Sequence, residues 1–373
     1  MDSFNPERLR EIRIVSKMTL EQVAINLGIT KQAVSKYERG RSIPSYETIN
    51  KIINILNVPM QFLSKSSISS SGLNTLLFFR TVSSTTKTQI EFADTICKWN
   101  YEILQGIIPF EDIPNMNLPE IDESLSISEK AVFLRQYWRL GISPIENMVD
   151  VLENNGFFVF VVNSSELNTD AYSRIINDTP IIVLNEYKGT SVRQRFSLAH
   201  ELGHLILHRN LSDVDFDLRS KEIEKEASIF ASSFLMPPVK FSSTVVSHKL
   251  DHFLNLKKEW KVSIAAMIYH CKQQGILDDK QSESLQMQLS KKWGRKTEPF
   301  DNELIFEKPL FLSKKLQKYV VDRASFEYFF DATRLPITVV ERIAFLPEGY
   351  LSRYFVDIPV GDSMIGYEQL SLF

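Results

Sequence analysis

Cysteine is scarce in this 373-residue chain. Its two cysteines, Cys97 and Cys271, lie far apart and in no spacing typical of a metal site. A disulfide scaffold is therefore excluded, and a reducing compartment is the natural expectation. The length itself is enough for roughly two to four domains.

Long hydrophobic runs are also missing. No stretch approaches the length of a membrane span. The N-terminal residues 1–6 lack the basic segment and apolar run of a signal peptide. We therefore expect a cytoplasmic protein without a membrane partner.

The chain as a whole has little net charge, with a formal value of −3. This balance conceals an asymmetry. Residues 1–65 hold ten Lys and Arg against six Asp and Glu, a net of +4, which leaves −7 for the remainder. A basic segment on an acidic body indicates one module that binds an anion.

Residues 6–65 read as a succession of short helices. Thr19 and Gln22 form a capping box at the start of one helix, and Gly28 ends it. The next helix is expected over Lys31–Arg39. Two short helices joined by a turn that contains glycine predict a helix-turn-helix.

The second helix of this pair begins with polar residues, as expected of a recognition helix in the major groove of DNA. Gln and Lys suit the edges of adenine and guanine, and arginines beyond the helix suit phosphates. The alternative is an inert helical bundle used for protein contacts. The predicted DNA-binding residues are Gln22, Lys31, Gln32, Ser35, Lys36, Arg39 and Arg41.

The segment MTLEQVAINLGITKQAVSKYERGRSIPSYETINKIINILNV resembles the Xre/Cro-type helix-turn-helix family. The resemblance implies double-stranded DNA as the partner of this head. In that family an arginine of the first helix pairs with a glutamate that ends the recognition helix. Arg13 and Glu38 occupy those places here, so we expect Arg13 to be structural.

Residues 66–127 read as a linker and a helical spacer. The serine-rich residues 65–72 suggest flexibility. Residues 73–108 read as helical, first around Leu76–Phe79 and then over Thr88–Ile108. This segment carries no recognisable chemistry, so a spacer and a dimer contact both remain open.

The rest of the chain is organised around an H-E-x-x-H sequence, His200-Glu201-Leu202-Gly203-His204. Residues four apart share a face of a helix, so both imidazoles can reach one metal ion. Glu201 would lie beside the water that the metal activates, where a general base belongs. The alternative is a core helix that happens to carry histidines, although a buried glutamate between them would need a partner.

A tetrahedral zinc site needs a third protein ligand. We expect it from the helix Arg219–Leu235, which holds three glutamates. Glu226 lies four residues before Phe230, on the edge of an apolar face, and is the prediction. Glu222 is the reserve candidate, and Glu224 is expected to point elsewhere.

Other side chains are assigned with less support from the pattern. Tyr172, Tyr187 and His208 are candidates for stabilising the transition state or contacting substrate. His208 reads equally well as a surface histidine at a helix end, which the helix dipole favours. Arg193 and Arg195 are expected to tether the helix to a neighbouring carboxylate.

The segments RQRFSLAHELGHLILH and EKEASIFASSFLMP resemble the ImmA/IrrE family of metallopeptidases. The resemblance implies a zincin-like body in which His200, His204 and Glu226 bind zinc and Glu201 is the catalytic base. Members of this family often carry an Xre-type head, and their described targets are DNA-binding repressors.

The predicted fold is multi-domain and mainly α: an all-α helix-turn-helix head, an α+β body with a small sheet and a helical C-terminal region. The strands are expected over residues 157–162, 170–176 and 180–185. The predicted domain limits are 1–65 for the head, 66–127 for the linker and spacer, 128–240 for the peptidase and 241–373 for the C-terminal domain.

The predicted function is a DNA-binding regulator whose zinc endopeptidase domain cleaves a repressor or another Xre-type regulator. The alternative is a regulator or antitoxin that cleaves nothing and uses the peptidase fold as a metal-dependent binding scaffold. The intact Glu201 favours the first. A stress or anti-phage switch is a weaker third reading, and a homodimer is a further option.

Overall fold

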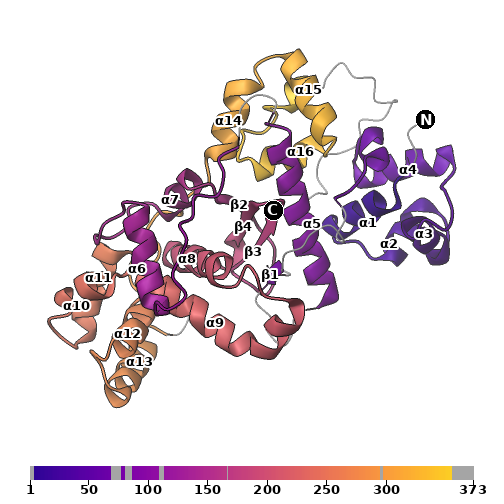
Figure 1. The fold of residues 1–373 in the computed structure, drawn as a ribbon. Helices are drawn as coiled ribbons and strands as arrows, with labels where there is room; N and C mark the ends of the chain where they lie inside the picture. Colours follow the sequence, from indigo (N-terminus) through magenta and orange to yellow (C-terminus); the bar gives the residue numbers. More distant parts are fainter. Residues whose placement is uncertain are drawn as a thin grey trace.

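The protein is described here by a computed structural model, covering residues 4–68, 77–79, 86–108, 113–165, 167–294 and 297–354. Within these ranges it is mainly helical with one small sheet, which confirms the predicted fold class. Figure 1 shows helices α1–α4 at one end of the molecule, helices α10–α13 at the other, and the sheet between them.

The head is a bundle of four short helices and a 3-10 turn. The predicted capping box at Thr19 and Gln22 is present, and Gly28 ends its helix with a left-handed φ of 68°. Val23, Val34 and Ile52 are completely buried in the core of the bundle. The elements are α1 (Pro6–Val15), α2 (Leu20–Leu27), α3 (Lys31–Glu38), α4 (Tyr46–Leu56) and η1 (Met60–Ser64).

The sheet has four strands in the order β1-β3-β4-β2. The pair β2–β4 is parallel, and the pairs β3–β4 and β1–β3 are antiparallel. Asn177 and Asp178 join β3 to β4 with positive φ values of 45° and 62°, which suit a two-residue hairpin. The strands are β1 (Leu77–Phe79), β2 (Phe158–Val162), β3 (Ala171–Ile176) and β4 (Thr179–Asn185).

The helical reading of residues 76–79 was wrong in part. Leu77–Phe79 forms the edge strand β1, paired with Tyr172–Arg174 of β3. Three successive apolar residues carry no period that separates a strand from a helix, and the open edge of β3 decides the outcome. Residue 76 and the serine-rich residues 69–72 of the predicted linker lie outside the described ranges.

The remaining elements surround the sheet or extend from it. The predicted helix of the spacer is present as α5 (Lys87–Gln105). The other helices are α6 (Ile127–Tyr137), α7 (Met148–Asn154), α8 (Ser191–Leu207), α9 (Asp213–Leu235), α10 (Pro238–Thr244), α11 (Leu250–Trp260), α12 (Ile264–Gln273), α13 (Asp279–Trp293), α14 (Phe311–Tyr319), α15 (Arg323–Thr333) and α16 (Ile337–Ile343), with 3-10 turns η3 (Glu186–Lys188) and η4 (Ser352–Tyr354).

Each face of the sheet belongs to a separate hydrophobic core. One core joins one face to α5, the head and helices α14–α16. The other joins the opposite face to α6–α9 and to helices α11–α13. Neighbouring residues of a strand point to opposite faces, so β3 contributes Tyr172 to the first core and Ala171 to the second. The predicted domain limits concern independent folding and stay a prediction.

The head is fixed to α5 by buried charges. Arg8 on α1 donates to Glu102 on α5, with Nη2 2.6 Å from Oε1, and to Glu11, with Nη1 2.8 Å from Oε2. Trp99 Nε1 on α5 donates to the same oxygen of Glu11 at 3.1 Å. Lys65, at the end of the head, completes the group with its Nζ 2.9 Å from Glu102 Oε2.

None of the helices in the described ranges combines the length and the apolar composition that crossing a membrane requires.

Candidate metal centre and DNA-binding face

Helix α8 carries the H-E-x-x-H sequence into the second core. It packs against β3 and β4, with Leu198, Leu202 and Leu205 completely buried. His200 and His204 lie one turn apart on the side of α8 that faces α9. Both imidazoles are buried, with residual exposures of 9% and 2%.

Two imidazole nitrogens and one carboxylate meet between α8 and α9. His200 Nε2 lies 3.0 Å from His204 Nε2. Glu224 places Oε2 3.4 Å from His200 Nε2 and Oε1 3.5 Å from His204 Nε2. Ligands about 2.1 Å from a tetrahedral zinc ion are about 3.4 Å apart. Two histidines and a carboxylate are also a known zinc donor set, so these residues fit the ion.

The third member of this cluster is Glu224, and the expectation that Glu224 points elsewhere was wrong. Glu226, the predicted third ligand, instead lies with Oε2 2.8 Å from His208 Nε2. At about 100° per residue, Glu224 and Glu226 flank the same buried stripe of α9 on opposite sides. An apolar face alone could not distinguish them.

Small residues bring the Glu224 side of α9 close to α8. A Cβ at Gly203 would lie 3.2 Å from both Cα and O of Ala227 and 3.3 Å from Cβ of Phe230. Ala227 and Ala231 are completely buried. This pattern of small residues was the signal that pointed to Glu224, since small side chains allow two helices to approach closely.

Burial and contacts set the protonation of the cluster. Burial lowers the pKa of His204 to about 4, so its imidazole is neutral at pH 7. Burial alone would raise the pKa of Glu224, but the neighbouring imidazoles of His200 and His204 outweigh it and the pKa falls. Neutral imidazoles and an ionised carboxylate are the forms that bind a metal ion.

The second nitrogen of each histidine also faces a polar atom. His200 Nδ1 lies 3.4 Å from Ser228 Oγ, which itself donates to the backbone oxygen of Glu224 at 2.8 Å. His204 Nδ1 lies 3.1 Å from His208 Nδ1. His208 is 3% exposed, so the reading of it as a surface histidine was wrong.

Glu201 points from α8 toward the sheet. Its Oε2 accepts a hydrogen bond from Ser173 Oγ on β3 at 2.6 Å. Both side chains are buried. Ser173 was not among the predicted site residues, although a serine within an apolar strand is a signal, because a buried hydroxyl needs a partner.

The two tyrosines proposed as donors differ in their positions. Tyr172 is the neighbour of Ser173 on β3, so it points to the opposite face and packs in the core with α5. Its predicted place in the site was therefore wrong. Burial also raises its pKa well above the ordinary value. Tyr187 is 61% exposed in η3, and its role stays a prediction.

The two arginines before the motif tether α8, as predicted. Arg193 Nη2 lies 2.7 Å from Asp170 Oδ2. Arg195 is buried and forms an ion pair with Glu307, whose other oxygen accepts from the backbone N–H of Met148 at 2.7 Å. Arg195 thereby joins α8 to the start of α7.

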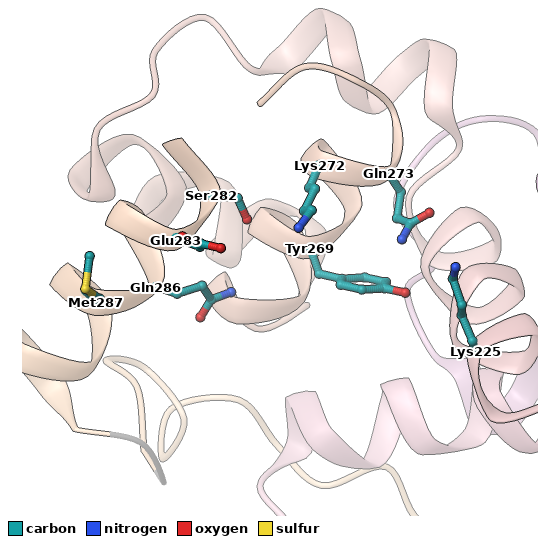
Figure 2. A pocket seen from close by; sticks show the side chains of 8 residues that line it. All are labelled: Lys225, Tyr269, Lys272, Gln273, Ser282, Glu283, Gln286 and Met287. Atoms are coloured by element: carbon teal, nitrogen blue, oxygen red, sulfur yellow. The ribbon is translucent and has the colours of Figure 1, made fainter. Parts of the chain in front are cut away.

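A cavity of about 860 Å³ lies between α9, α12 and α13. Figure 2 shows Lys225, the residue between the two glutamates, turned toward it together with Tyr269 and Lys272. Lys272 Nζ is engaged by Asp279 Oδ1 at 2.8 Å. Successive residues of α9 therefore serve the histidine cluster, this cavity and His208.

In the head, α3 presents the predicted DNA-binding residues. Lys31, Gln32 and Lys36 are exposed on this helix, and Ser35 is partly buried. Arg39 and Arg41 are exposed just beyond it. Gln22 is exposed while its Oε1 closes the capping box, and Lys31 Nζ lies 3.4 Å from Glu21 Oε2.

The expected ion pair inside the head is present. Arg13 Nη2 lies 2.8 Å from Glu38 Oε2, and Arg13 Nη1 donates to the backbone oxygen of Met18 at 3.2 Å. Arg13 thus holds the end of α3 against α1, and its side chain has a structural role, as predicted.

Comparison with known protein families gives two matches. Residues 9–63 match the helix-turn-helix family. Residues 158–272 match the IrrE N-terminal-like domain, a peptidase family. The second range contains β2–β4, the H-E-x-x-H sequence and the glutamates of α9.

Individual relatives match the head. A prophage-derived, uncharacterised HTH-type transcriptional regulator of Bacillus subtilis, YonR, is 37% identical over 71 residues, which are 19% of this chain and 66% of YonR. The uncharacterised HTH-type transcriptional regulator YqaE of the same organism is 41% identical over 59 residues, 16% of this chain and 51% of YqaE. The chain thus spans about half to two thirds of the length of these two relatives.

Among solved structures, the ComR protein of S. thermophilus in complex with DNA and its signalling peptide ComS is 12% identical, covering 76% of this chain and 90% of ComR. The TM-score of 0.16 is too low to support an argument about fold.

The family matches agree with the motifs: the chain joins a helix-turn-helix domain of the DNA-binding type to an IrrE/ImmA-like domain of a metallopeptidase family.

Proposed function

We propose that this protein is a DNA-binding transcriptional regulator whose body is a zinc-dependent endopeptidase. The observation that carries the proposal is the convergence of His200, His204 and Glu224 with Glu201 in the same helical turn as the histidines. In this assignment the zinc ligands are the two histidines and Glu224. A bound zinc ion would polarise a peptide carbonyl and activate a water molecule.

Glu201 is the general base of the proposed reaction. It takes a proton from the attacking water and passes it to the leaving amine. Ser173 holds its carboxylate at a fixed position through the 2.6 Å hydrogen bond. Burial of the site strengthens each of these interactions, because fewer water molecules compete for the charges.

The proposed substrate is a regulatory protein. The head binds double-stranded DNA through α3, and this concentrates the peptidase body near proteins that occupy the same DNA. A repressor or another Xre-type regulator is therefore the proposed target, and cleavage would change transcription at that site. This proposal places the protein in the cytoplasm with the DNA.

The test compares cells that produce the wild-type protein with cells that produce Glu201→Gln. New protein N-termini are identified by mass spectrometry in both. We expect at least one new terminus inside a helix-turn-helix regulator in the wild-type cells alone. The same termini in both cells, with equal amounts of the two proteins, would contradict the peptidase activity.

The second candidate is a regulator that binds metal and a partner without cleaving it. The observation that favours it is the hydrogen bond from Ser173, which occupies one oxygen of the Glu201 carboxylate. Under this alternative Glu201→Gln keeps full regulation of transcription. A reporter gene measured with wild type, Glu201→Gln and His204→Ala separates the two candidates. The scaffold needs the metal but not the base, so it keeps regulation in Glu201→Gln and loses it in His204→Ala, whereas the peptidase loses regulation in both.

A further inference from the structure

We propose that His208 and Glu226 position the zinc ligand His204 through a directional chain of hydrogen bonds. The inference rests on the zinc centre proposed above. Neither residue belongs to the cluster of His200, His204 and Glu224, so both act through His204.

The hydrogen-bond chain runs from the histidine cluster toward solvent along one side of α8 and α9. His204 Nδ1 lies 3.1 Å from His208 Nδ1, and His208 Nε2 lies 2.8 Å from Glu226 Oε2. The other oxygen of Glu226, Oε1, is 3.6 Å from Arg219 Nη2. His204 and His208 are buried, whereas Arg219 is about half exposed.

The order of donors and acceptors gives the chain its direction. An ionised carboxylate can only accept, so Glu226 requires the proton of His208 on Nε2. A neutral His208 then has an acceptor at Nδ1, which requires the proton of His204 on its own Nδ1. In this tautomer the Nε2 of His204 carries an electron pair, on the side of the ring that faces His200 and Glu224.

The opposite tautomer of His204 would block the site. With its proton on Nε2, His204 would donate to Glu224 Oε1, 3.5 Å away, and present no ligand atom. The contact with His208 selects against this state. Outer partners of ligating histidines commonly fix the ring in this way, and their loss costs about 10- to 100-fold in metal affinity.

The neighbouring ligand His200 has a weaker arrangement. Its Nδ1 faces Ser228 Oγ at 3.4 Å, and that hydroxyl is not connected to a carboxylate side chain in the contacts of the described residues. We therefore infer that His204 depends more on its partner than His200 does.

The first experiment measures zinc affinity of the full-length protein by competition with a chromophoric chelator. We expect a 10- to 100-fold weaker affinity for His208→Phe, a smaller loss for Glu226→Gln and partial recovery for His208→Asn, whose oxygen can accept from His204. Lys221→Gln, on the same helix and exposed, is the control. Ser228→Ala should lose less than His208→Phe.

Wild-type affinity in both folded variants, His208→Phe and Glu226→Gln, would overturn the inference. If His208→Phe does not fold, Glu226→Gln still decides. The Co²⁺-loaded proteins add a spectroscopic readout, because a reoriented His204 changes the visible absorption bands of the ion, whereas a change in stability alone leaves them in place.

A second experiment needs no metal. Nitrogen-15 NMR of histidine-labelled, metal-free protein reports the tautomer of each ring. The protein has only six histidines, so the signals are few. We expect the proton on Nδ1 of His204 and on Nε2 of His208. The reverse pattern would overturn the inference. If the wild type shows the expected tautomers but binds no zinc, the proposed zinc centre fails and the hydrogen-bond chain stands.

Discussion

Arg8 on α1 reaches Glu102 on α5, with Nη2 2.6 Å from Oε1, and both side chains are buried. Lys65 binds the second oxygen of Glu102 and also donates to the backbone oxygens of Ala332 and Thr333 at 2.8 and 2.7 Å. One carboxylate therefore joins the head, α5 and the end of α15. Burial lowers the pKa of Lys65, although Glu102 partly offsets this effect.

The first prediction concerns this junction. Glu102→Ala leaves Arg8 and Lys65 buried without their shared partner, which we expect to cost about 3–5 kcal/mol in the free energy of unfolding. Denaturant unfolding measures the change. The matched control is Glu91→Ala on the same helix, which removes the exposed pair with Arg10 and should cost less than about 1 kcal/mol. Equal losses for the two variants would refute the special role of Glu102.

The second prediction separates the base from the ligands. Glu201→Gln should keep one zinc ion, because its carboxylate faces Ser173, and should lower the rate of cleavage by about 10²- to 10⁴-fold. His204→Ala should lose the zinc. Metal content is measured by mass spectrometry on purified protein, and exposed Glu186→Gln serves as control. A zinc-free Glu201→Gln protein would place Glu201 among the ligands instead.

The third prediction ranks the two glutamates of α9. Glu224→Gln should weaken zinc binding by more than the roughly 10- to 100-fold expected for loss of an outer partner, and by more than Glu226→Gln does. The reason is that Glu224 alone of the two lies within 3.5 Å of both ligand nitrogens. Chelator competition on both variants provides the measurement, and the reverse ranking would restore Glu226 as the ligand.

The fourth prediction is a pH dependence that arises outside the histidine cluster. Burial raises the pKa of Glu153 on α7 to about 7, although the backbone N–H groups of Phe311 and Leu310 at the start of α14 oppose the shift. Asp150 raises and Lys314 lowers the same pKa. The folded protein therefore binds a proton more tightly than the unfolded chain does.

This sign determines the direction of the effect on stability. The contribution of Glu153 is fully present below the unfolded pKa of 4.5 and is lost as pH rises through about 7. In the wild type, Glu153 should make the free energy of unfolding fall by on the order of 2–3 kcal/mol between these two pH values, and Glu153→Gln should abolish this fall. Unfolding experiments from pH 4.5 to pH 8 compare the variant with wild type, and parallel curves would contradict the prediction.

The fifth prediction concerns α3. Lys31→Ala combined with Gln32→Ala should reduce sequence preference by at least about tenfold, since a good base contact provides about 1–3 kcal/mol of discrimination. Selection from random DNA followed by affinity measurements on selected and random duplexes gives the ratio. Lys51→Ala, which removes an exposed charge on α4, is the control. An unchanged ratio would remove α3 from the recognition role.

The sequence predicted those parts of the fold that local chemistry decides. Helix α2 of the head begins at a capping box and ends at a glycine, and each of these signals lies within a few residues of the helix end that it determines. Strands β2, β3 and β4 were predicted from their β-branched and aromatic residues. Strand β1 was missed because its pairing with β3 is a tertiary contact, which three residues in sequence do not encode.

The candidate site could likewise be predicted only as far as the pattern within a single helix or strand decides it. The spacing of His200 and His204 places them together on any helix, so the structure was needed only to confirm it. The choice between Glu224 and Glu226 depends on which side of α9 meets α8. The position of Tyr172 depends on which face of β3 meets α5. Both are relations between elements, which periodicity within one element leaves open.

Gly203 determines the distance between the two helices that supply the ligands. A Cβ at position 203 would lie only 3.2 Å from the Cα and O atoms of Ala227, so the approach of α9 is limited by main-chain contact, which rotamer changes cannot relieve. Position 203 therefore limits how closely the Glu224 side of α9 approaches the two histidines, without offering a side-chain atom to the cluster. The geometry of the histidine cluster is in this respect a property of helix packing, set by the smallest residue in the motif.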